Sequence, residues 1–239
     1  LRESHKRQKS ARALSKDGRR TRRQKHRHSR ENMDRSGVEN LVGTASTPYG
    51  KATYWSDRYT KDTDQFDWYQ RYAGIKSILA KYAKKKGAIL DVGCGNSRLG
   101  EDMVNDGYAN VRCVDNCAVV VEQMSAKYGA LGGLTFGRDD ARTLESVADG
   151  SVDCVVDKGT LDAVLCGEDS REGSAQLLAA ALRVLKKKGV LLIVSHSKAR
   201  AALIPPGAWK VATHDVAAPA LDDAKPATTH YVYACTKIA

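Results

Sequence analysis

Short apolar segments alternate with helical patterns between residues 88 and 194, and this alternation restricts the fold more than any other feature. The apolar segments lie at 88–92, 111–114, 134–136, 152–156 and 190–194, and each has the length of a buried strand. Helical patterns lie between them, near 99–105, 118–128 and 175–185. Strands joined by crossover helices form a parallel sheet that is covered on both faces. The sequence therefore predicts an α/β fold with a mostly parallel sheet.

The flanking segments extend this core. Before it, an aromatic-rich segment at 49–72 leads into a helix predicted around 75–80, which ends at three lysines and Gly87. After it, residues 210–213 and 231–235 are strand-like, and the connection between them is polar, contains proline and shows no helical pattern. We therefore expect an antiparallel pair at the C-terminus and a sheet of seven strands with helices on both faces.

Most of the net charge of +11 lies in the first 35 residues, which hold 14 Lys and Arg against four Asp and Glu. These residues include almost no large apolar side chain, so they cannot bury enough surface to offset the entropy of ordering. We expect a basic disordered arm over 1–35, an aromatic cap with a helix over 36–87, and the main domain over 88–239. The arm is interpreted as a solvated extension, a nuclear or RNA-contacting segment, or a mitochondrial presequence.

The six cysteines form no CxxC pair, and several lie in apolar segments where a thiol acts as a small hydrophobic side chain. No apolar stretch is long enough to cross a bilayer, and no signal-peptide pattern is present. We therefore expect a reducing compartment and no membrane partner. The cytoplasm is favoured, and the basic arm leaves the nucleus or the mitochondrion as alternatives.

The first apolar segment runs into a glycine-containing loop, Asp91-Val92-Gly93-Cys94-Gly95-Asn96, and a helix follows. Glycine permits a tight turn and a close approach of a ligand, and free N–H groups at the helix start favour an electronegative group. A nicotinamide-dinucleotide fingerprint would need a third glycine at the position of Arg98. Gly93 and Gly95 are therefore candidates to bind another cofactor, and a ligand-free tight turn is the alternative.

Acidic residues follow the later strands. Asp115 lies 22 residues after Gly93, at a strand end where an acid accepts hydrogen bonds from ribose hydroxyls. Asp140 follows the third strand, where it would accept from an adenine amino group, although Asp139 and Asp140 form a solvated helix cap in the alternative interpretation. Asp157 follows the fourth strand, where the reacting group of a cofactor should face its acceptor.

Three motifs of this chain resemble those of the seven-strand, class I protein-lysine methyltransferases, whose core is a Rossmann-like α/β domain. In particular they resemble the enzymes that modify translation elongation factor 1-alpha, and the likeness runs from about Tyr54 to Cys235. The motifs are the glycine loop at 93–97, the segment Asp157-Lys158-Gly159-Thr160-Leu161-Asp162, and the pattern Tyr54-Trp55-Ser56-Asp57-Arg58-Tyr59 followed by Phe66-Asp67-Trp68-Tyr69.

The resemblance implies S-adenosyl-L-methionine as the cofactor, no metal, and a lysine of a protein such as elongation factor 1-alpha as the substrate. It implies that Trp55, Tyr59 and Trp68 close over the methionine end, and aromatic faces do attract a sulfonium cation. Taken alone, these aromatic residues predict only core packing. The remaining implied cofactor contacts are Gly93, Asp115, Asn116, Asp140, Ala141 and Lys158. Without the resemblance, Lys158 would be interpreted only as a partner in a structural ion pair.

Methyl transfer from a sulfonium is an in-line displacement that needs a positioned neutral amine and the exclusion of water. We expect the substrate lysine to enter between the aromatic residues and residues 157–160, where Asp157 contacts the amine. The chain departs from the family before Trp209, where a short segment with Pro205-Pro206-Gly207 replaces a longer helical connection. Substrate recognition in this region is therefore not fixed by the resemblance, and a target other than that of the family is left open.

Two alternatives involve RNA. An RNA methyltransferase guided by the basic arm is the first, but base-amino methylases carry an Asn/Asp-Pro-Pro-aromatic loop after the fourth strand, and this chain has Asp157-Lys158-Gly159-Thr160 there. The second is a non-catalytic cofactor-binding module that the arm recruits to RNA.

Overall fold

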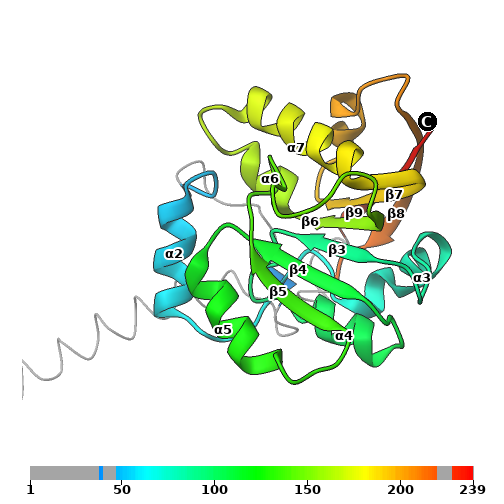
Figure 1. Ribbon diagram of the computed structural model, residues 1–239. Coiled ribbons are helices and arrows are strands. Elements are labelled where there is room, and N and C mark those ends of the chain that lie inside the picture. The colour runs from blue at the N-terminus through cyan, green and yellow to red at the C-terminus, as the bar shows by residue number, and fades with distance from the viewer. Residues whose placement is uncertain (1–37, 40–46, 220–227, 239) are drawn as a thin grey trace, which may run out of the picture.

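The computed structural model describes residues 38–39, 47–219 and 228–238, so the basic arm expected at 1–35 lies outside the described part. The main sheet has seven strands in the order β5-β4-β3-β6-β7-β9-β8 (Figure 1). The parallel strands are β3 (Ile89–Val92), β4 (Val111–Asp115), β5 (Leu134–Arg138), β6 (Val152–Lys158) and β7 (Leu185–Ser195). Strand β9 (Thr229–Lys237) runs antiparallel to both β7 and β8 (Trp209–Ala217). The predicted seven-stranded, mostly parallel sheet is confirmed.

Helices cover both faces of this sheet (Figure 1). On one face lie α3 (Tyr72–Tyr82), α4 (Leu99–Asn105) and α5 (Ala118–Tyr128), and on the other lie α6 (Thr160–Val164) and α7 (Ser170–Val184). A 3-10 helix, η1 (Lys198–Leu203), forms in the short connection between β7 and β8. Successive strand side chains point to opposite faces, so Ile89 belongs to the first apolar cluster and Leu90 to the second.

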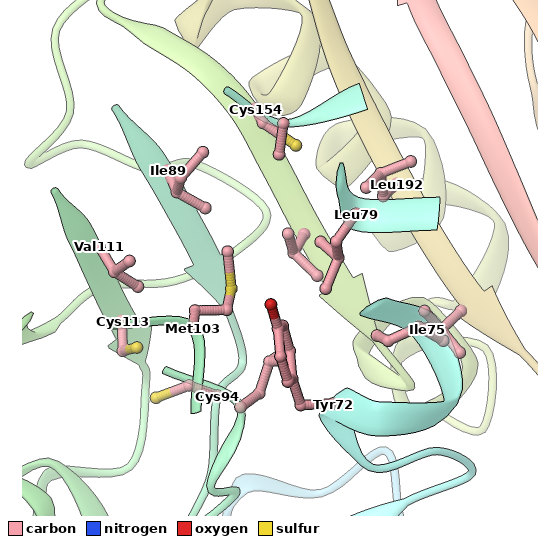
Figure 2. Packing of buried hydrophobic residues seen from close by; sticks show 14 of the residues in the cluster. Tyr72, Ile75, Leu79, Ile89, Cys94, Met103, Val111, Cys113, Cys154 and Leu192 are labelled. Atoms are coloured by element: carbon pink, nitrogen blue, oxygen red, sulfur yellow. The ribbon is translucent and has the colours of Figure 1, made fainter. Parts of the chain in front are cut away.

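The first cluster joins α3 and α4 to the strands. Figure 2 shows Ile75 and Leu79 of α3 and Met103 of α4 pointing toward strand residues such as Ile89 and Cys154. All of these side chains are at most 2% exposed, and burial of each large apolar one contributes roughly 1.5–3 kcal/mol. All six cysteines are free and five are buried, which agrees with their interpretation as small hydrophobic side chains.

The segment before the sheet contains α2 (Ala52–Lys61) and β2 (Asp67–Trp68), and β2 pairs in parallel with β1 (Val38–Glu39). The sequence patterns underestimated several elements. Helix α3 is longer than the predicted 75–80. Strand β7 already begins at Leu185, whereas the predicted strand begins at 190, because the exposed lysines 186–188 interrupt the apolar pattern. No helix in the described ranges is long and apolar enough to cross a membrane.

The order in which the strands are connected indicates the edge of the sheet at which a ligand binds. From β3 the chain proceeds outward through β4 to β5, and it then returns to β6 on the other side of β3. In open α/β sheets, ligands bind outside the carboxyl ends of the strands at the point where the strand order reverses. This point lies between β3 and β6.

Candidate active site

A cavity of about 220 Å³ is lined by residues that follow β3, β4, β5 and β6 and by the segment around α2. The structure brings to this cavity every residue that the sequence proposed for cofactor binding, and it leaves out Asp157. The lining includes Trp55, Tyr59, Trp68, Gly93, Gly95, Asp115, Asn116, Asp140, Ala141 and Lys158.

Two glycines shape the floor of the cavity. Gly93 and Gly95 have φ values of +62° and +51°, in the left-handed region that favours glycine. A Cβ atom at Gly93 would lie 2.1 Å from Oγ1 of Thr160, and one at Gly95 would lie 2.4 Å from the Tyr59 hydroxyl oxygen. The loop is therefore packed between α6 and α2, and any side chain at either position would collide with these neighbours.

Asp115 couples this loop to β4. Its Oδ2 accepts a hydrogen bond of 2.9 Å from the backbone N–H of Gly95, and its Oδ1 accepts one of 2.9 Å from Cys117. Burial raises the pKa of Asp115, and the hydrogen bonds from Cys117 and Gly95 partly offset that rise. A ribose contact remains a prediction for this carboxylate, which also holds the glycine loop in place.

The aromatic side chains form a continuous cover. The ring of Trp55 stacks on Tyr59 at 5.9 Å between centroids and meets Trp68 edge-on at 5.8 Å. The indole N–H of Trp55 donates to the carbonyl oxygen of Tyr49 over 2.7 Å. Tyr59 and Trp68 belong to the apolar core as well as to the cavity wall, so their core packing is confirmed and a contact with the methionine end of a cofactor stays a prediction.

A buried ion pair joins this cover to β6. Lys158 Nζ lies 3.0 Å from Asp67 Oδ1, and both side chains are 4% exposed. Lys158 also donates to the carbonyl oxygen of Trp68 over 3.4 Å, and the hydroxyl of Ser97 donates to Asp67. Asp91 lines the same cavity, and burial raises its pKa to about 7, while Lys158 lowers it and Asp67 raises it. Lys158 was among the predicted cofactor contacts, whereas Asp67 and Asp91 were not assigned to the site from the sequence.

Asp139 and Asp140 both line the cavity and brace the loop that follows β5. Asp139 accepts from the backbone N–H of Ser146 over 2.9 Å, and Asp140 accepts from Nη2 of Arg142 over 2.6 Å. Burial opposes ionisation of Asp140, but the hydrogen bonds from Arg142 outweigh it and lower the pKa. The residues after Ala141 form turns, so the helix cap expected as the alternative is wrong. An adenine contact stays a prediction.

Asp157 does not line the cavity, which corrects the expectation that it contacts the substrate amine. Its side chain is completely buried beneath the start of α6. Its Oδ1 accepts from the backbone N–H of Thr160 over 3.0 Å, and its Oδ2 accepts from that of Leu161 over 3.0 Å. Burial raises the pKa of Asp157 to about 8, partly offset by these hydrogen bonds. The carboxylate therefore fixes the wall of the cavity and does not face into it.

Comparison with known proteins agrees with this geometry. The fold superposes with a TM-score of 0.58 on 1,6-didemethyltoxoflavin-N1-methyltransferase of Burkholderia thailandensis, which was solved with S-adenosylhomocysteine bound. The match has 15% sequence identity and covers 79% of this chain and 87% of that one. Residues 90–193 match the family model of a methyltransferase domain. This is the class I methyltransferase fold.

Two relatives extend the likeness beyond the fold. The eEF1A lysine and N-terminal methyltransferase of Mus musculus is 34% identical over 187 residues, which cover 74% of this chain and 27% of that protein. The EEF1A lysine methyltransferase 4 of Mus musculus is 36% identical over 122 residues, which cover 50% of this chain and 48% of that protein. The family resemblance predicted from the motifs is confirmed. The match spans only about a quarter of the length of the first relative and about half of the length of the second.

The described structure also contains a buried network that the sequence did not reveal. Asp162 of α6 is 1% exposed and accepts from Tyr69 Oη over 2.8 Å, Ser195 Oγ over 2.7 Å and Arg200 Nε over 2.6 Å. The Nδ1 atom of His196 lies 3.0 Å from the same carboxylate. Tyr69 follows Trp68 directly, so the network anchors the aromatic cover to α6 and to the end of β7.

Proposed function

We propose that this chain is an S-adenosyl-L-methionine-dependent methyltransferase that methylates the side chain of a lysine in a protein, with elongation factor 1A as the expected target. One observation carries the proposal: every residue expected to bind the cofactor lines a single cavity at the carboxyl edge of the parallel strands. The names of the two mouse relatives support the choice of substrate.

The residues of the cavity fit the parts of this cofactor. Asp115 and Asn116 would hold the ribose, and Asp140 and Ala141 would flank the adenine. The methionine end would pass beside Gly93 and Gly95, where the absence of Cβ atoms lets Thr160 and Tyr59 pack against the loop. The aromatic cover of Trp55, Tyr59 and Trp68 would face the cation. When bound, the cofactor supplies a methyl group activated by a sulfonium.

The protein contributes position and exclusion of water to the reaction. A substrate lysine would reach the cavity between the aromatic cover and Gly159-Thr160. An ammonium group has no lone pair, and transfer from water into an apolar surrounding favours its neutral form. Since Asp157 is occupied by backbone N–H groups, we assign the loss of the amine proton to water and not to that carboxylate.

The test is a transfer assay with recombinant elongation factor 1A, the full chain and cofactor labelled on its methyl group, with and without ribonuclease. The expected result is label in the protein that survives ribonuclease, followed by assignment of the methylated lysine by mass spectrometry. Substitution of that lysine by arginine in the target should abolish the label.

Two glycine variants give a matched control for this assay. Gly93→Arg should abolish transfer because a side chain there meets Thr160, whereas Gly150→Arg should retain it because nothing lies within 4 Å of a Cβ at Gly150. The two positions have similar φ values of +62° and +56°. Label that appears in RNA alone, or cofactor binding without transfer to elongation factor 1A, would contradict the proposal.

A further inference from the structure

Three ionisable side chains lie in the wall of the cavity or directly behind it. Lys158 and Asp91 line it, and Asp67 pairs with Lys158 at 3.0 Å. They come from three elements, since Asp67 lies in β2, Asp91 in β3 and Lys158 at the end of β6. Asp67 and Asp91 are 3% and 1% exposed, so water screens these charges weakly.

The position of the lysine ammonium matters for what this cluster does. Nζ of Lys158 is already engaged by the Asp67 carboxylate and by the carbonyl oxygen of Trp68. One ammonium therefore faces two carboxylates, and its charge, which pairs with Asp67, also lowers the pKa of Asp91. With both acids ionised, the cluster carries one net negative charge next to the cavity.

The cofactor and its product differ in the property to which this charge responds. S-adenosyl-L-methionine and S-adenosylhomocysteine share the adenosine and amino-acid parts, and they differ by one methyl group and the positive charge on sulfur. Hydrogen bonds to the shared parts cannot distinguish them. A negative charge in the wall acts on the charged amino-acid part of both ligands alike. In the cofactor it attracts the sulfonium as well, and this additional attraction is absent for the thioether.

We propose that the cluster of Asp67, Asp91 and Lys158 makes this cavity bind the sulfonium cofactor in preference to the uncharged thioether that remains after transfer. This inference rests on the proposed function, because it assumes that cofactor. It assigns to Asp67 a role in specificity although Asp67 does not itself line the cavity. It also implies that Lys158 limits this preference, because the positive charge of the lysine offsets the negative charge of one carboxylate.

The measurable quantity is the ratio of the two dissociation constants, S-adenosylhomocysteine over S-adenosyl-L-methionine, from calorimetry on the full chain. We choose pH 8, above the pKa of about 7 to which burial raises Asp91, so that its carboxylate is mostly ionised. Each variant is its own control, because both ligands meet the same folded molecules. Partial misfolding lowers the number of sites and leaves the ratio intact.

The variants change the charge of the cluster by known steps. Asp67→Asn removes one negative charge and should lower the ratio about tenfold, the effect of about 1.4 kcal/mol at a protein-like dielectric. Asp91→Asn should act in the same direction, which keeps the test decisive if one of the two variants does not fold. Lys158→Met should raise the ratio, and the double variant Asp67→Asn/Lys158→Met should return it to within about threefold of the original.

A remote ion pair supplies the matched control. Asp153 lies 2.7 Å from Lys186 at the start of β6, the opposite end of this strand from Lys158. Asp153→Asn makes the same change in net charge, and the ratio should not move.

Two outcomes would overturn the inference, and they are distinguishable. If the cluster variants weaken both ligands equally, the three residues serve the fold or hold a part common to both ligands. The proposed function would then stand, and the charge preference would be wrong. If the unmodified chain binds neither ligand, the proposed function fails, and the inference fails with it.

Discussion

Replacement of Asp162 by asparagine tests whether the buried network holds the site together through charge. Asparagine keeps the size of the side chain but removes its negative charge and one of its two acceptor oxygens. Asp162 accepts hydrogen bonds from Tyr69, Ser195 and Arg200 and is 1% exposed, so no water can replace what the substitution removes. We expect a lower free energy of unfolding and a characteristic dependence on pH.

The magnitude follows from the pKa. Burial opposes ionisation of Asp162, but hydrogen bonds from His196 and Arg200 outweigh it and lower the pKa to about 2. The pKa of an aspartate in an unfolded chain is about 3.9, so the ionised form contributes about 2.5 kcal/mol to stability at neutral pH. Because the folded-state pKa is the lower one, this contribution is present above about pH 4 and disappears as the pH falls toward 2. The asparagine side chain does not titrate.

The assay is urea unfolding of the original chain and of Asp162→Asn at pH 7, 5, 4 and 3. At pH 7 the variant should be less stable by about 3 kcal/mol, since breaking a buried pair also leaves Arg200 without its partner. The difference should be constant from pH 7 to 5 and about 1 kcal/mol smaller at pH 3. Asp215→Asn, at an exposed position of β8, should change stability by less than about 0.5 kcal/mol throughout. A difference that is equal at pH 7 and pH 3 would refute the electrostatic explanation.

Two further substitutions address the floor and the wall of the cavity. Gly93→Ala should weaken binding of S-adenosyl-L-methionine at least about tenfold because its Cβ would lie 2.1 Å from Oγ1 of Thr160, whereas Gly150→Ala has open space and should leave binding unchanged. Equal effects of the two variants in calorimetry would mean that backbone strain alone is responsible. Asp157→Asn should keep turnover within about threefold and cost about 1 kcal/mol in unfolding, since this carboxylate caps Thr160 and Leu161. A hundredfold fall in kcat at unchanged KM would instead mean that Asp157 meets the amine.

The cavity edge was predictable because the carboxyl ends of parallel strands converge. Once the sequence assigns strands ending near Val92, Val114 and Val156, the residues that follow them must lie at one edge of the sheet. Gly93 and Asp115 were found in this way, and the resemblance added Lys158 and the aromatic cover. Spacing along the chain was sufficient for Gly93 and Asp115, because each lies at the end of a strand or just after it.

The roles of the carboxylates were not predictable, because they depend on partners that are remote in sequence. Asp67 and Lys158 are separated by 91 residues, and Tyr69 and Asp162 by 93. Helix α6 has only five residues, too few for a helical period to be visible, so its start at Thr160 was read as an open loop. Without that helix, Asp157 looked available to a substrate, and its backbone partners were not foreseen.

The two long-range contacts also explain why the aromatic segment belongs to the active site. Asp67 and Tyr69 lie on either side of Trp68. Asp67 contacts Lys158 at the end of β6, and Tyr69 contacts Asp162 in α6. The first contact, to Lys158, lies at the cofactor cavity, and the second, to Asp162, lies at the end of β7. Because the same short segment is held at both points, the cover over the cofactor cannot shift without moving the wall that would receive the substrate lysine. Loss of either contact should therefore raise the dissociation constant of the cofactor and lower kcat together.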